Sequence, residues 1–147
     1  MPAYIPPLLG LIGLLIALGI FRVVLSYSEG SPEVKKIGDM IHSGAMSFMK
    51  TEYTYLVVFV LVLAVLVFFA LGWETATAVL VGASSSALAG FIGMFAATKA
   101  NTRTAAAASE SGAAAALSIS FYGGSIMGLC VALSLIHISE PTRRRHI

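Results

Sequence analysis

The residues of this chain that could do chemistry are few, and they stand apart from one another. The candidates for acid–base, metal or nucleophilic chemistry are His42, Cys130, the serines at 84–86, Glu52 and Glu74. A metal site needs several ligands at short spacing, and a nucleophile needs a neighbouring base. The sequence shows neither pattern and no phosphate-binding loop. It therefore predicts no catalytic, cofactor-binding or metal-binding residue in this chain.

Each candidate has a simpler structural interpretation. With no second His or Cys nearby, His42 is predicted to be a solvated surface side chain. Ser84, Ser85 and Ser86 could line a polar path, but serines in apolar helices usually bond to backbone or to neighbouring helices. Cys130 lies in an apolar run and is predicted to be a small buried hydrophobe.

The composition indicates a membrane protein. The chain has 147 residues, of which 58% are hydrophobic and only 11% charged, whereas a soluble domain carries about 25% charged residues. The net charge of +2 comes from the arginines at 143–145 with Glu140, so the rest of the chain is neutral. No nucleic-acid partner is expected. One cysteine excludes a disulfide framework within the chain.

Hydropathy predicts an all-α, polytopic membrane helix bundle with four spans, at about residues 4–27, 54–72, 75–98 and 113–132. Ser31-Pro32-Glu33 has the pattern of a helix start. It opens an amphipathic helix over 32–53, with Val34, Ile37, Ile41, Ala45 and Phe48 on its apolar side, which is expected at the membrane surface and continuous with the second span. Residues 72–75 predict a tight hairpin, and residues 109–112 a polar turn.

The third span is built from small residues. Gly82, Ser86 and Gly90 recur every four residues, as do Ala83 and Ala87, so each set lies on one side of a helix. Small residues let helices approach closely in lipid, so these sides are predicted to be packing surfaces. Gly124 and Gly128 repeat the pattern in the fourth span.

The basic residues predict the orientation. Lys35, Lys36 and Lys50 lie in the loop 28–53, and Lys99 and Arg103 lie in the loop 99–112. The positive-inside rule places both loops in the cytoplasm and the N-terminus outside. Lys99 and Arg103 are interpreted as anchors at the cytoplasmic interface.

The end of the chain differs from the rest. Residues 133–143 are LSLIHISEPTR, which resembles the translation of a sequencing adapter. We therefore expect residues 133–147 to be a non-native tail on a truncated fragment, and no function is assigned to His137, His146 or the arginines at 143–145. The alternative is a genuine basic tail that binds anionic lipid.

Several motifs together resemble the membrane-bound, ion-pumping pyrophosphatases. They are IHSGA at 41–45 with Phe48, GFIGM at 90–94, KANTRTA at 99–105 and GGS at 123–125. Their order and spacing resemble the start of that family, over about residues 4–132.

The resemblance implies a homodimeric pump of the prokaryotic inner membrane, whose subunit has about sixteen spans and its N-terminus outside. Such a pump couples cytoplasmic pyrophosphate hydrolysis to H⁺ or Na⁺ translocation and requires Mg²⁺ and, in one type, K⁺. The family's catalytic ligands lie on later helices. The resemblance therefore makes residues 1–132 an outer-ring scaffold in the lipid bilayer, inactive alone.

Two other classes of protein were weighed. A rotor-type proteolipid needs a carboxylate in mid-membrane, and the second and third spans contain none. A non-enzymatic four-helix membrane scaffold or assembly protein, or part of another transporter, is the remaining alternative. The first of these requires the tail to be native.

Overall fold

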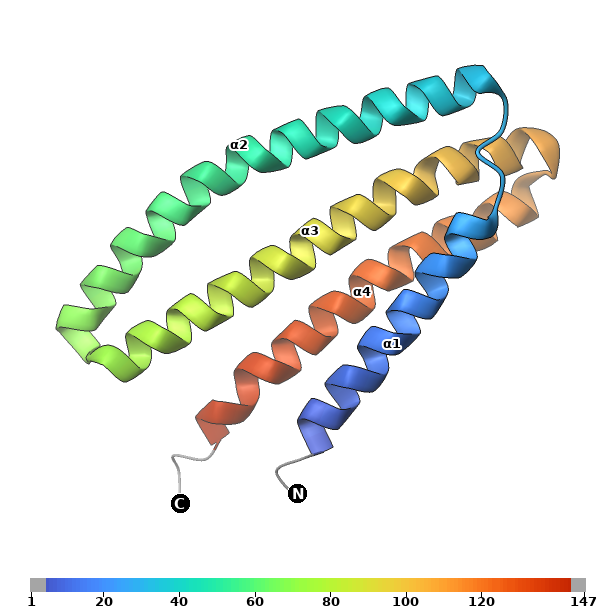
Figure 1. The fold of residues 1–147 in the computed structure, drawn as a ribbon. Helices are drawn as coiled ribbons and strands as arrows, with labels where there is room; N and C mark the ends of the chain where they lie inside the picture. Colours follow the sequence, from blue (N-terminus) through green and yellow to red (C-terminus); the bar gives the residue numbers. More distant parts are fainter. Residues whose placement is uncertain (1–4, 144–147) are drawn as a thin grey trace.

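Four long helices make up the computed structural model, which describes the backbone of residues 5–143 and the side chains of residues 8–132. They are α1 (Ile5–Ser26), α2 (Pro32–Leu71), α3 (Trp73–Glu110) and α4 (Ala113–Arg143). Figure 1 shows them as an up-and-down arrangement in which α3 lies between α2 and α4, and α1 packs beside α4. All four contain a segment long and apolar enough to cross a membrane. The predicted all-α membrane helix bundle is confirmed.

The helix ends follow from local sequence. Ser31 is extended and its side-chain oxygen accepts a hydrogen bond from the amide of Val34, with Pro32 as the first helical residue. Leu71 and Trp73 are separated by Gly72 alone, whose φ of 89° is open to glycine and costly for other residues. This single residue reverses the chain, so the predicted antiparallel hairpin is confirmed. The turn at Ser111 and Gly112 confirms the predicted polar turn.

The amphipathic segment continues into the second span, as predicted. The two form one 40-residue helix, about 60 Å long at 1.5 Å per residue. Figure 1 shows α2 following α3 along its length in a gentle bow. The predicted place of residues 32–53 at the membrane surface stays a prediction.

The core is narrow and consists mostly of small residues. The buried cluster joins α1, α3 and α4 through Ala17, Val24, Ala89, Ala96, Ala100, Ile126 and Cys130. Alanine at these positions lets the helix backbones come close, which increases dispersion contacts along the helices. Cys130 lies in this cluster, so its prediction as a small buried hydrophobe is confirmed.

Two glycines fix the register of α3 against α4. A β-carbon on Gly123 would meet the β-carbon of Ala100, and one on Gly93 would meet the side chain of Met127. The first turns of α4 therefore lie beside the 99–110 segment of α3. Hydropathy assigned the start of α4 to the membrane and residues 99–110 of α3 to a cytoplasmic loop. In the structure the two segments lie side by side at the same height along the bundle axis.

The small-residue stripes of α3 do not form its closest contact. Ser86 is exposed, and Gly82, Ala83, Ala87 and Gly90 are only half-buried. The most deeply packed side of α3 lies further along the helix, at Ala89, Gly93, Ala96 and Ala100. Spacing marks small residues without showing which neighbour they meet, so packing of the Gly82, Ser86 and Gly90 side against helices outside this chain stays a prediction.

Residues 133–147 carry the proposed non-native tail. The backbone of α4 continues through residue 143, and the side chains of this segment, with residues 144–147 altogether, lie outside the described part. The interpretation of this tail stays a prediction.

Candidate functional site

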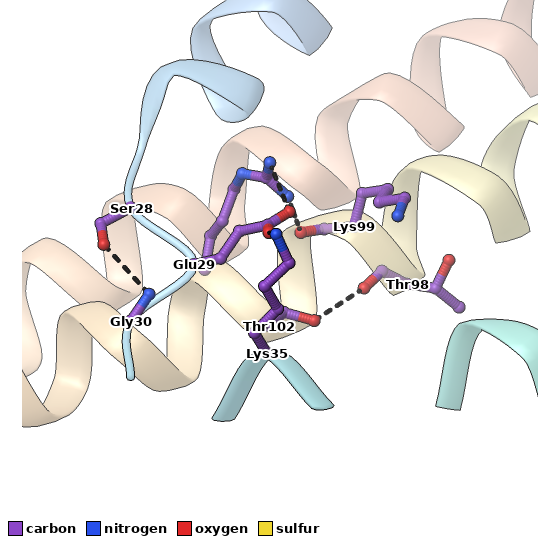
Figure 2. Close-up of polar contacts among 8 residues, drawn as sticks. Ser28, Glu29, Gly30, Lys35, Thr98, Lys99 and Thr102 are labelled. Carbon is purple, nitrogen blue, oxygen red and sulfur yellow. Dashed lines mark hydrogen bonds and ion pairs between the residues drawn. The ribbon is translucent and has the colours of Figure 1, made fainter. Parts of the chain in front are cut away.

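Polar side chains gather where the connection between α1 and α2 crosses α3. Glu29, in that connection, places one carboxylate oxygen 2.9 Å from Nη2 of Arg103 on α3. Its other oxygen lies 3.1 Å from Nζ of Lys35 on α2. Figure 2 shows Glu29 and Lys35 meeting at this crossing. One carboxylate thus connects a loop and two helices.

Arg103 is the buried member of this cluster. Its side chain is 7% exposed, whereas that of Glu29 is 27% exposed and that of Lys35 57%. Nη1 of Arg103 also donates to the backbone carbonyl of Lys99, at 2.9 Å. Its Nε has no hydrogen-bond partner among the described residues. Burying such an N–H costs about 1–3 kcal/mol, which the ion pair with Glu29 offsets.

This geometry gives Arg103 a partner that the sequence did not predict. The side chain is buried against Glu29, because the connection at 27–31 folds over it. That Arg103 anchors the chain at the cytoplasmic interface stays a prediction. Lys99 is half-buried and contributes its backbone carbonyl.

The connection adopts this path because of two local features. Gly30 has a φ of 77°, and a β-carbon there would overlap that of Ala106, at 2.7 Å. Its amide donates to the hydroxyl of Ser28, at 3.0 Å, as Figure 2 shows. Only glycine allows both the backbone conformation and the close approach to α3. Glu29 is held between Ser28 and Gly30 and thereby aimed at Arg103.

The two cations also change the chemistry of Glu29. The hydrogen bond from Lys35, followed by the charges of Arg103, Lys35 and Lys99, lowers the pKa of the Glu29 carboxyl below its usual 4.5, against the opposing effect of burial. Glu29 is therefore ionised at neutral pH and acts as a fixed negative charge. This makes it unsuited to exchange protons near pH 7.

A second polar contact joins α2 and α3 further along the hairpin. Nδ1 of His42 lies 2.7 Å from Oγ1 of Thr98. The same hydroxyl is 3.0 Å from the carbonyl of Phe95 and 3.1 Å from that of Met94. A hydroxyl has one proton, so the arrangement that satisfies these groups has Thr98 donating to a carbonyl and His42 donating through Nδ1. The imidazole also meets the ring of Phe95 edge-on, with centroids 5.1 Å apart.

His42 therefore differs from its prediction. It is half-buried between two helices and has a hydrogen-bond partner, so it is not a solvated surface residue. The partner, Thr98, is 5% exposed. His42 lies on the side of α2 that faces α3, together with Gly38, Met49 and Tyr53.

The predicted apolar side of the amphipathic segment points elsewhere. Ile37, Ile41 and Phe48 are each more than half exposed, whereas Val34 and Ala45 are half-buried. A side of small and polar residues packs on α3 because its thin profile lets the two backbones approach. A β-carbon on Gly38, for example, would overlap the side chain of Thr102.

The cluster does not fit a magnesium ion. Mg²⁺ prefers free carboxylate oxygens, and both oxygens of Glu29 are engaged by cations. Among the described residues, no group of three or more His, Cys, Asp or Glu side chains lies together. The arrangement fixes helices relative to one another, and we derive no chemical step from it. That no catalytic residue lies in this chain stays a prediction.

The remaining candidates stay apart from this cluster. Ser84 donates to the carbonyl of Leu80, at 2.7 Å, which confirms the expected bond to backbone. Glu52 and Glu74 lie at opposite ends of the membrane part of the hairpin, and both are exposed. The structure brings together Glu29, Arg103 and Lys35, a set that no sequence spacing marked, because each comes from a different element.

Comparison with known proteins identifies the relatives of this chain. The family described as Inorganic H⁺ pyrophosphatase matches residues 11–141. The chain belongs to this family. The match includes residues after 132, in the segment whose sequence resembles an adapter.

Individual relatives of the family agree with this match. A relative from Clostridium tetani is 43% identical over 122 residues, which are 83% of this chain and 18% of the relative. A K⁺-insensitive pyrophosphate-energized proton pump of Methanosarcina mazei is 40% identical over 137 residues, or 91% of this chain and 20% of that pump. A K⁺-stimulated pyrophosphate-energized sodium pump of Thermotoga maritima is 40% identical over 122 residues, or 80% and 17%.

The chain spans about a fifth of the length of the relatives it matches. With four helices that could cross a membrane and relatives that are ion pumps, the chain is an integral membrane protein. The resemblance noted in the sequence is confirmed.

Proposed function

We propose that this chain is part of a pyrophosphate-driven cation pump, which hydrolyses pyrophosphate and moves H⁺ or Na⁺ across the membrane. The observation that carries the proposal is the family match over residues 11–141. The relatives' names supply the pyrophosphate and the two ions. The structure supports a scaffold role for this segment, since its polar cluster connects helices and engages both oxygens of its carboxylate.

We further propose the features that the resemblance to the family implies. The intact protein is a homodimer of subunits with about sixteen spans in a prokaryotic inner membrane, and it uses Mg²⁺ bound by residues outside the described helices. K⁺ stimulates one type. Residues 27–31 and 111–112 face the cytoplasm, which is supported by the position of Lys35, Lys99 and Arg103 at that end of the bundle.

The choice of ion is proposed to lie outside this segment. A proton pump and a sodium pump share the same 40% identity with it, so its residues are compatible with both ions. The segments that correspond to residues 1–132 can be exchanged between a proton-pumping and a sodium-pumping relative. We expect each relative to keep its ion preference.

The experiment uses the intact gene product and the 147-residue chain side by side. In inverted vesicles, the intact protein is expected to hydrolyse pyrophosphate when Mg²⁺ is present and to accumulate H⁺ or Na⁺. The 147-residue chain is expected to do neither. Intact protein that inserts into the membrane but does not cleave pyrophosphate would contradict the proposed pump function. Hydrolysis by the 147-residue chain would contradict the proposed scaffold role.

A further inference from the structure

A groove runs between α2 and α3 in the part of the hairpin that lies within the predicted membrane spans. Its volume is about 410 Å³, within the range of about 300–1,000 Å³ usual for small-molecule sites. Its α2 wall includes Tyr53, Val57 and Leu61, and its α3 wall includes Leu80 and Ala83. The bow of α2 in Figure 1 and the short side chains on α3 leave this space open.

Three hydroxyls line the groove, those of Tyr53, Ser84 and Ser86, and two of them have partners within the chain. The hydroxyl of Tyr53 donates to the carbonyl of Ala87, at 2.6 Å. That of Ser84 donates to the carbonyl of Leu80, at 2.7 Å. Because two of the three hydroxyls are satisfied internally and the other lining side chains are apolar, the groove suits a hydrocarbon better than a ligand that needs several hydrogen bonds.

The surroundings of the groove are those of a lipid-facing surface. The neighbouring α2 side chains Val58, Phe59, Val62 and Leu66 are all more than half exposed. Among the described residues, α2 packs against α3 alone. The open side of the groove is therefore continuous with an apolar surface at membrane depth.

A positive charge stands at one end of the groove. Lys50 is exposed and lies three residues before Tyr53 and seven before Val57, on the same side of the helix. It lies just before the apolar run of α2 and is the cation nearest to that run in the sequence. Glu52 is about 200° round the helix from Lys50 at 100° per residue. It stands four residues before Leu56, at the other edge of the groove.

We propose that this groove binds one anionic phospholipid, with an acyl chain along Tyr53–Leu61 and the headgroup phosphate at Lys50. The apolar walls accept the chain because burying its methylene groups removes them from contact with less complementary surroundings. Lys50 can reach the headgroup because lysine extends its ammonium toward the membrane interface. The bound lipid fills the space between the two helices and supports the hairpin where few side chains connect it.

The test measures lipid retained by the purified chain. The chain is mixed with equal amounts of phosphatidylglycerol and phosphatidylcholine, and the complexes are counted by native mass spectrometry. Wild type is expected to retain phosphatidylglycerol preferentially. Lys50→Gln should lower the ratio of phosphatidylglycerol to phosphatidylcholine about fivefold, the factor that one lysine near an anionic surface supplies. Ala83→Phe, which fills the groove, should remove retention of both lipids.

Two matched variants serve as controls. Lys36→Gln removes an exposed cation distant from the groove, and Val81→Phe adds an aromatic ring on an exposed part of α3. Both should bind lipid as wild type does. Helix content by circular dichroism is checked throughout, and Leu61→Trp fills the groove from α2 if Ala83→Phe fails to fold.

Three outcomes would overturn the proposal. Equal retention by the Ala83→Phe and Val81→Phe variants would show that lipid does not occupy the groove. An unchanged ratio of phosphatidylglycerol to phosphatidylcholine in the Lys50→Gln variant would contradict the proposed contact between Lys50 and the headgroup phosphate. A Val57→Cys variant in a Cys130→Ala background that forms a disulfide-linked dimer in vesicles would show that a second copy covers the groove instead.

Discussion

The two halves of the α2–α3 hairpin are held together by different means. Near the 27–31 connection, Glu29 pairs with Arg103 and Lys35, His42 meets Thr98, and Gly38 lets α2 approach α3. Toward Gly72, the hydrogen bond from Tyr53 to the carbonyl of Ala87 borders an open groove. Both halves belong to the same two continuous helices.

This difference shows what positions long helices in this protein. Small residues occur in both halves, but they give close packing only where the facing side chain is also short or shaped to fit. At Gly38 the facing residue is Thr102, whereas at Ala83 the facing side chains leave a gap. The polar half sets the spacing of the helices, and the membrane half leaves room for another molecule.

The largest effect is expected when the close approach at Gly38 is blocked. Gly38→Ala adds a β-carbon that would overlap the side chain of Thr102, and overpacking of this kind costs about 1–3 kcal/mol. Gly90→Ala, in the membrane half, would meet only the hydroxyl of Tyr53, at 3.1 Å. Thermal unfolding in detergent should therefore show a lower Tm for Gly38→Ala than for Gly90→Ala.

Gly44→Ala provides the control for helix propensity. Nothing lies within 4 Å of its added β-carbon, and alanine is favoured over glycine inside a helix by about 0.5–1 kcal/mol. This variant should be more stable than wild type. Equal destabilisation by the changes at 38 and 90 would contradict the difference between the two halves.

Removing the buried arginine should have the next largest effect. Arg103→Met leaves Glu29 without its closest cation and frees the carbonyl of Lys99. Hydrogen bonds to charged groups contribute about 1.5–3 kcal/mol, and partial exposure of Glu29 places the expected loss at about 2 kcal/mol or less. Lys35→Met removes the exposed partner of the same carboxylate, and its loss should stay below about 1 kcal/mol.

The measurement is chemical unfolding of both variants at neutral pH. The Arg103→Met variant should unfold at lower denaturant concentration than Lys35→Met. The reverse order would mean that the exposed cation, rather than the buried one, holds the connection to α3.

The smallest effect is expected from pH. The pKa of Glu29 is lowered in the folded chain, so its ionised form stabilises the fold above its usual pKa of 4.5. That contribution is lost as pH falls below 4.5 and through the lowered folded-state pKa. Unfolding profiles taken from neutral to acidic pH should show a shallower loss for Glu29→Gln than for wild type. Parallel profiles would show that the ion pairs contribute no measurable stability.

Local features could be predicted well from the sequence. Ser31 before Pro32 marks the start of α2, and Gly72 marks the hairpin, because caps and turns depend on residues close together in the chain. The candidate site was predicted less well. The partner of Arg103 was not predicted and His42 was placed in solvent, since Glu29 and Thr98, which these two residues contact, are distant from them in sequence.

By itself, the sequence determined four apolar helices, their order, their turns and the family to which the chain belongs. Hydropathy and short-range patterns are enough for these, because each depends on one segment at a time. The tertiary structure decided which side of α2 faces α3, which residue pairs with Arg103, and the register of α4 on α3 at Gly123 and Ala100. These depend on the fit between two surfaces, and alanine-rich helices look alike in composition until their neighbours are in place.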